Sequence, residues 1–163
     1  AKGNDMEAAA EQLDRALLSY IDAARPAQVR LQQVLTQIAG YSLSLMTSKK
    51  RSMHPEGALV SARAALKEVR EQLAALKPPS AAAHHYHHLK SARDATRIAF
   101  GQAMICTRAD ATEGERQTLV QALHAANEHV RMTARLLPGF ETIDFSQACC
   151  AFHAQAADNA IST

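Results

Sequence analysis

Apolar residues recur along this chain at alternating spacings of four and three positions, in four separate segments. A helix turns by about 100° per residue, so this spacing places the apolar side chains on one stripe of each helix. Charged and polar residues fill most of the remaining positions. The pattern is typical of helices that pack along their length, and it predicts an all-α fold, an antiparallel helical bundle of four long segments with short connections.

The first segment is predicted to run from about residue 5 to residue 47, after the capping residues Asn4 and Asp5. Its stripe stays in phase through Pro26, although a proline inside a helix removes one hydrogen bond and costs roughly 3 kcal/mol. We therefore expect a kink or a break near Pro26, and the unchanged phase favours the kink. An unbroken helix would be on the order of 60 Å long, so part of it is expected to overhang into a partner subunit or to fold back at Pro26. The stripe consists of Leu13, Leu17, Tyr20 or Ile21, Ala24, Ala27, Leu31, Val34, Leu35, Ile38 and Leu45.

The second segment begins with a start signal, Pro55 followed by Glu56, and is ended by Pro78 and Pro79. It carries the clearest heptad pattern of the chain. The predicted inward positions are Leu59, Ala62, Leu66, Val69, Leu73 and Leu76.

The third segment extends from Ser80, a candidate N-cap, to about Arg108. Four histidines lie in its first turns, and one of them falls on the apolar stripe. The predicted stripe is His85, Leu89, Ala92, Thr96, Ala99, Ala103 and Cys106.

The fourth segment is predicted to start at a capping box formed either by Asp110 with Glu113 or by Thr112 with Glu115. Pro138 ends it. Its stripe consists of Leu119, Leu123, Ala126, Val130, Thr133 and Leu137.

The last residues have a different composition, rich in phenylalanine and cysteine. They predict a short amphipathic helix that closes one end or side of the bundle. Its apolar face would contain Phe145, Ala148, Cys149, Phe152 and Ala156. We expect residues 1–163 to form one domain, with residues 1–4 and 158–163 frayed.

Composition supports the helical interpretation, since the apolar fraction of 47% owes much to alanine and the chain has no tryptophan. The 18 basic and 16 acidic residues are mixed along the chain, which argues against a nucleic-acid surface. No apolar run approaches the roughly 18–20 residues of a membrane helix, so we expect no transmembrane segment. Three cysteines do not form a disulfide framework. Free thiols favour the cytoplasm, and a mature exported form is the alternative.

The histidine-rich start of the third segment is the main candidate site. His84 and His88 are four residues apart, the spacing at which two imidazoles of one helix reach the same metal ion. His85 is added as a third candidate ligand, and His54, His129 or His153 would join if the fold brought them near. Zinc, copper or nickel would suit such a site. The competing interpretation is a solvated first turn without a metal.

A second candidate consists of Cys149, Cys150 and His153, which are three and four residues apart and offer thiolate and imidazole ligands. The competing interpretation is two small, buried, apolar residues beside a surface histidine.

The sequence contains no glycine-rich phosphate loop, nucleophile motif, zinc-protease motif or Cys-x-x-Cys pair. It also has no Glu-x-x-His pair of the kind that di-iron bundles use. We therefore hypothesise a non-enzymatic interaction or scaffold protein without a cofactor, which binds a protein partner or forms a homodimer. A metal-binding bundle centred on His84 and His88 is the alternative, and a bundle that senses a small ligand is a second alternative.

Overall fold

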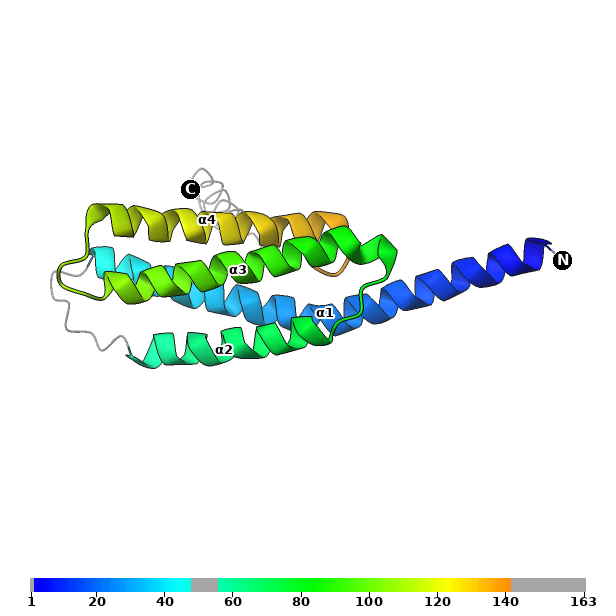
Figure 1. Cartoon of the computed structure of the whole chain (residues 1–163), viewed down its shortest axis with the longest axis horizontal. Coiled ribbons are helices and arrows are strands. Elements are labelled where there is room, and N and C mark those ends of the chain that lie inside the picture. Colours follow the sequence, from blue (N-terminus) through cyan, green and yellow to red (C-terminus); the bar gives the residue numbers. More distant parts are fainter. Residues whose placement is uncertain (1, 48–55, 142–163) are drawn as a thin grey trace, which may run out of the picture.

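The computed structural model describes residues 2–47 and 56–141 of the chain. Four helices and a short 3-10 helix form within these ranges, where no strand is found, and the helices pack against one another. The predicted all-α class is therefore confirmed for this part of the chain. Figure 1 shows the helices lying side by side along one long axis, with the N-terminal part of α1 projecting beyond the others.

Helix α1 (Lys2–Thr47) is unbroken over its 46 residues and is about 70 Å long at 1.5 Å per residue. Pro26 lies inside it, so the expected alternative of a break at this residue is wrong, while the kink stays a prediction. The helix also begins before Asn4 and Asp5, which therefore lie in its first turn and are not the residues that precede it. The helix does not fold back at Pro26, and its N-terminal part projects beyond the other described helices. The expected overhang into a partner subunit stays a prediction.

Helix α2 (Glu56–Ala75) is joined to helix α3 (Ala83–Cys106) through the 3-10 helix η1 (Ser80–Ala82). The predicted capping role of Ser80 is wrong, because Ala82 occupies the N-cap position of α3 and no side chain bonds there. Pro79 has an extended backbone, and the chain makes a tight 3-10 turn before the α-helix begins.

Helix α4 (Glu113–Leu136) starts with a complete capping box. Of the two predicted boxes, the structure has Thr112 with Glu115: the Thr112 side chain accepts from the Glu115 N–H, and the Glu115 carboxylate accepts from the Thr112 N–H. The competing cap residue, Asp110, instead accepts a hydrogen bond from Arg108.

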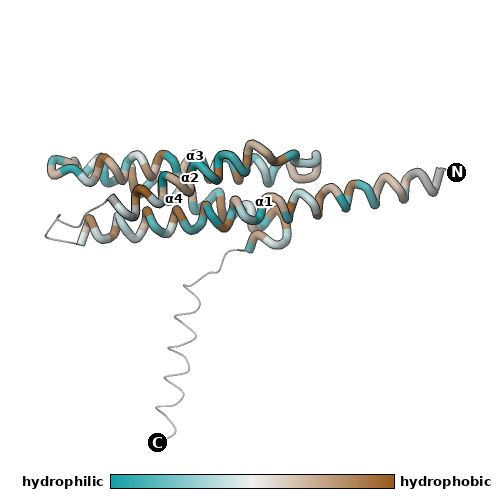
Figure 2. Tube along the Cα trace, turned by 90° about the horizontal axis from the view of Figure 1, so that it is seen from below, coloured by the Kyte–Doolittle hydropathy of each residue, from teal (hydrophilic) through white to brown (hydrophobic). Residues whose placement is uncertain are grey.

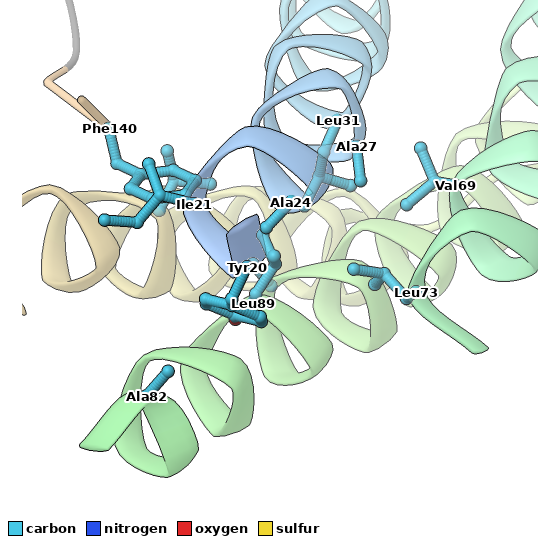
Figure 3. Packing of buried hydrophobic residues seen from close by; sticks show 12 residues of the cluster. Tyr20, Ile21, Ala24, Ala27, Leu31, Val69, Leu73, Ala82, Leu89 and Phe140 are labelled. Carbon is cyan, nitrogen blue, oxygen red and sulfur yellow. The ribbon is translucent and has the colours of Figure 1, made fainter. Parts of the chain in front are cut away.

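The core follows the predicted stripes closely. All seven stripe residues of the third segment are buried in α3, and these are the only buried residues of that helix. One core cluster contains residues of α1 together with Leu73 of α2 and Leu89 of α3 (Figure 3). Its α1 members are Tyr20, Ile21, Ala24, Ala27 and Leu31. Burial of these apolar faces is the main force that holds the four helices together.

A buried polar contact fixes the end of α4 to α1. The Gln28 amide donates to the main-chain oxygen of Phe140 at 2.9 Å, and its own oxygen accepts from Thr133 at 3.0 Å. Phe140 is thereby held in the core, 2% exposed, against the ring of His85. This contact places the last described residues beside the point where α1 leaves the bundle.

Several predictions concern residues outside the described ranges. They include the start of the second segment at Pro55, His54 as an added ligand, the short C-terminal helix, and the site formed by Cys149, Cys150 and His153.

Candidate functional site

The projecting part of α1 is the most unusual surface of the fold. We call residues 2–16 the arm. Every side chain from Met6 to Ala16 is exposed, whereas Leu17 is half-buried and Tyr20 is fully packed. The arm thus begins where the contacts with the other helices end (Figure 1).

The apolar stripe of the bundle continues into the arm without a change of phase. Met6, Leu13 and Leu17 precede Tyr20 at the same heptad spacing that buries the rest of α1. Met6 is 76% exposed and Leu13 is 47% exposed. Figure 2 shows apolar and polar positions mixed along this part of the helix, and none of the other described helices lies beside it.

A groove between α2 and α3 is lined mainly by positively charged side chains. Four cationic side chains and one carboxylate line it, and it is open to solvent. We call it the basic groove, and it is lined by Leu66, Lys67, Arg70, Arg93, Asp94 and Arg97. Arg93 pairs with Asp94 at 2.7 Å, and Lys67 lies 3.9 Å from Glu71. Within the described ranges, neither Arg70 nor Arg97 forms an ion pair, so the groove has positive charge available for an anionic partner.

Three histidine rings form a row where the first turns of α3 meet α4. Nε2 of His88 lies 3.1 Å from Nε2 of His84, and Nδ1 of His88 lies 2.9 Å from Nδ1 of His129. We call these three residues the histidine row. His84 is exposed, while His88 and His129 are half-buried. Partial burial, and then the charges of its histidine neighbours, lower the pKa of His88.

His85 does not belong to this row. Its ring is 1% exposed and lies in the core, with Nδ1 2.9 Å from the hydroxyl oxygen of Tyr20. Burial, and secondly the charge of His88, lowers the pKa of His85 to about 4, so this ring is uncharged in the folded protein. Burial also raises the pKa of Tyr20. Among the described residues, Nε2 of His85 has no hydrogen-bond partner.

The structure therefore brings together two of the three predicted ligands, His84 and His88, whereas the ring of His85 lies in the core against Tyr20. It adds His129, which the sequence offered only as one of several further candidates. The signal for His129 was its position beside the apolar stripe of α4, where a side chain can reach the neighbouring helix.

Comparison with family models, with curated proteins and with solved structures finds no match to this chain. None of the helices within residues 2–47 and 56–141 is both long enough and apolar enough to cross a membrane. The fold and the surface together define an all-helical protein with three surface features, namely the arm, the basic groove and the histidine row.

Proposed function

We propose that the protein is a non-enzymatic interaction module, built as an antiparallel helical bundle, that uses its arm to bind another helical chain. The observation that supports this proposal is the apolar stripe of α1, which passes from the buried core into the exposed arm in the same phase. An isolated helix of about 15 residues gains little stability in water from its own hydrogen bonds. Another helix packed on the stripe would bury Met6 and Leu13 in the way that the bundle buries Tyr20 and Ala24.

A second copy of this chain is the partner that the charges favour, and the result would be a homodimer. The arm, residues 2–16, has four acidic and two basic side chains, and Glu7 and Asp14 flank its apolar stripe. The basic groove has the opposite charge, with Arg70 and Arg97 available for a carboxylate. In a reciprocal dimer, the arm of each copy would lie along the groove of the other. Such an exchange closes after two subunits, whereas a one-way contact would propagate into a filament.

Light scattering and sedimentation of the full chain over a range of concentrations test this proposal. We expect a homodimer, and we expect Leu13→Asp to weaken it at least tenfold. Burial of a leucine contributes about 1.5–3 kcal/mol, and 1.4 kcal/mol corresponds to a factor of ten in the dissociation constant.

Leu18→Asp is the matched control, because Leu18 is a second exposed leucine of the same helix that lies off the stripe. It introduces the same charge and the same helix propensity close to the arm. Equal weakening by both substitutions, or a monomer at every concentration, would contradict the proposal.

The groove is tested separately with the double variant Arg70→Glu/Arg97→Glu. Placing acids opposite Glu7 and Asp14 should weaken the dimer, and higher ionic strength should weaken the unmodified dimer as well. A dimer that depends on Leu13 but is insensitive both to salt and to the groove variant would show that the two arms pair with each other.

Binding of a metal ion at the histidine row is a second candidate function, and the distances between the three rings favour it. The third hypothesis, a bundle that senses a small ligand, has no supporting observation within the described ranges.

A further inference from the structure

Neighbouring rings of the histidine row lie within hydrogen-bond distance of each other, which is not required of a solvated histidine cluster. His88 lies between the two others and uses both of its ring nitrogens, one toward each neighbour. The ring centroids are 4.8 Å apart for His84 and His88, and 5.2 Å apart for His88 and His129. Two different helices position these rings, because His129 comes from α4 and the other two come from α3.

The two contacts of His88 are coupled through its single proton. A neutral imidazole has one N–H and one lone pair, so His88 donates on one side and offers its lone pair on the other. When the proton is on Nδ1, that N–H donates to Nδ1 of His129. The lone pair of Nε2 then points toward Nε2 of His84, its neighbour at 3.1 Å.

This arrangement resembles two ligands of a metal ion together with the residue that orients one of them. Zinc–nitrogen bonds of about 2.0–2.1 Å in a tetrahedral site place the two nitrogens about 3.3 Å apart. The separation of the Nε2 atoms is close to that value. Histidines that bind metals almost always donate their other N–H to an acceptor, which fixes the tautomer and the ring orientation.

We propose that His84 and His88 bind one divalent ion of the zinc, copper or nickel class through their Nε2 atoms, and that His129 is a positioning residue for His88. For the ion to bind, His84 has its proton on Nδ1, which leaves its Nε2 lone pair free. Each ring would bind the ion as a neutral imidazole, the usual form of a histidine ligand.

Only two ligands of the ion come from the described part of the chain. Within residues 2–47 and 56–141, no group of three or more histidine, cysteine, aspartate or glutamate side chains is arranged to hold an ion. Water would fill the remaining positions. The bound ion should therefore exchange readily with ions in solution. The site should bind copper and nickel more tightly than manganese, in the order typical of nitrogen ligands.

Calorimetric titration of the untagged, chelator-treated full chain with zinc, copper and nickel chlorides is the test. We expect one ion per chain, and we expect His84→Ala and His88→Ala each to abolish this stoichiometric uptake. His124→Ala is the matched control, since His124 is a histidine of α4 that lies outside the row. This variant should bind as the unmodified chain does.

The positioning role of His129 requires a separate measurement. His129→Phe keeps a ring but removes the acceptor, and it should weaken binding by 10–100-fold without changing the stoichiometry. His129→Asn supplies an amide oxygen as acceptor and should restore part of the affinity. Nitrogen-15 chemical shifts of His88 should report the Nδ1–H tautomer in the unmodified chain and a mixture of tautomers in His129→Phe.

Three results would each overturn the proposal: no uptake by the unmodified chain, uptake that persists in His84→Ala, or an equal loss of uptake in His124→Ala. Tight binding by His129→Phe with an unchanged tautomer of His88 would leave the two ligands in place but remove the role of His129. Because these substitutions lie on the surface, unchanged urea unfolding of each variant serves as the check on its fold.

Discussion

The hydroxyl oxygen of Tyr20 in α1 lies 2.9 Å from Nδ1 of His85 in α3, inside the core, although the two residues are 65 positions apart in sequence. The two rings meet edge to face, and Phe140 packs against the other side of the imidazole. A titratable ring is thus enclosed at the level where the arm leaves the bundle. Burial of this imidazole opposes its protonation, so the stability of the fold should depend on pH.

Acidification should destabilise the protein through His85. The pKa is about 4 in the folded chain and 6.5 for an ordinary imidazole, so the unfolded chain binds more protons between these values. The free energy of unfolding therefore falls as the pH falls through this window. The slope is about 1.4 kcal/mol per pH unit, and it applies only below the ordinary pKa of 6.5. We therefore expect the free energy of unfolding, measured with urea, to fall by about 2 kcal/mol between pH 7 and pH 5.

The double variant Tyr20→Phe/His85→Leu removes the titrating ring together with its partner. The difference in stability between pH 7 and pH 5 should shrink in this variant, whereas it should stay the same in His87→Ala, which alters an exposed ring. A pH dependence that the double variant leaves unchanged would assign the effect to other groups.

Gln28→Ala should be among the most destabilising substitutions at a polar residue. Gln28 is 2% exposed, and its loss leaves the main-chain oxygen of Phe140 without its donor. An unsatisfied buried polar group costs about 1–3 kcal/mol, and the cavity adds to this cost. Gln33→Ala, at an exposed position of the same helix, should change the urea midpoint little. Similar effects of the two substitutions would refute the structural role of Gln28.

Two glycines should respond to alanine in opposite directions. Gly139 has a φ of 85°, and an added Cβ would lie 2.5 Å from a guanidinium nitrogen of Arg25. The left-handed backbone costs alanine about 1–2 kcal/mol, even if Arg25 moves aside. Gly101 lies inside α3 with nothing within 4 Å of such a Cβ, so Gly101→Ala should stabilise by up to about 1 kcal/mol. Thermal unfolding of both variants provides the comparison, and a stabilised Gly139→Ala would contradict the assigned backbone.

Thr112→Ala should weaken the start of α4. Its hydroxyl accepts the Glu115 N–H at 3.2 Å, and loss of such a cap costs about 1 kcal/mol. Thr118→Ala is the control, because the Thr118 hydroxyl only donates to a main-chain oxygen within the same helix. Urea unfolding should show a clear loss for the first variant and a small change for the second. If Asp110→Ala cost more than Thr112→Ala, the assignment of the cap would be wrong.

The sequence predicted the inward positions of α3 well because burial there follows helical period alone. From Leu89 to Cys106, each residue of the stripe is small or apolar and meets a neighbouring helix. His85 was placed on the same stripe, yet its chemistry also suggested a metal ligand. The burial of His85 agrees with its place on the stripe, while its contact with Tyr20 could be found only from the fold.

The remaining features depend on tertiary structure or on backbone geometry that no pattern encodes. His88 and His129 are 41 residues apart, and their contact exists only because α3 and α4 pack with a particular offset. Asp110 and Thr112 are both good capping residues, so the path of the loop decided between them. The 3-10 turn of Ser80–Ala82, which follows Pro79, has no counterpart in the apolar pattern.

Because α1 is unbroken, one helix contains a part that is packed in the core and a part that is exposed, and the two parts should differ in local stability. Amide protons between Tyr20 and Ile38 lie under a packed core and should exchange only when the whole bundle opens. Those of the arm have no packing above them, so they should exchange by fraying, with protection that declines from Leu17 toward Lys2. A partner helix bound on the arm would slow amide exchange in each turn of the arm that it covers. Hydrogen exchange along this single helix would then measure how far an occupant reaches.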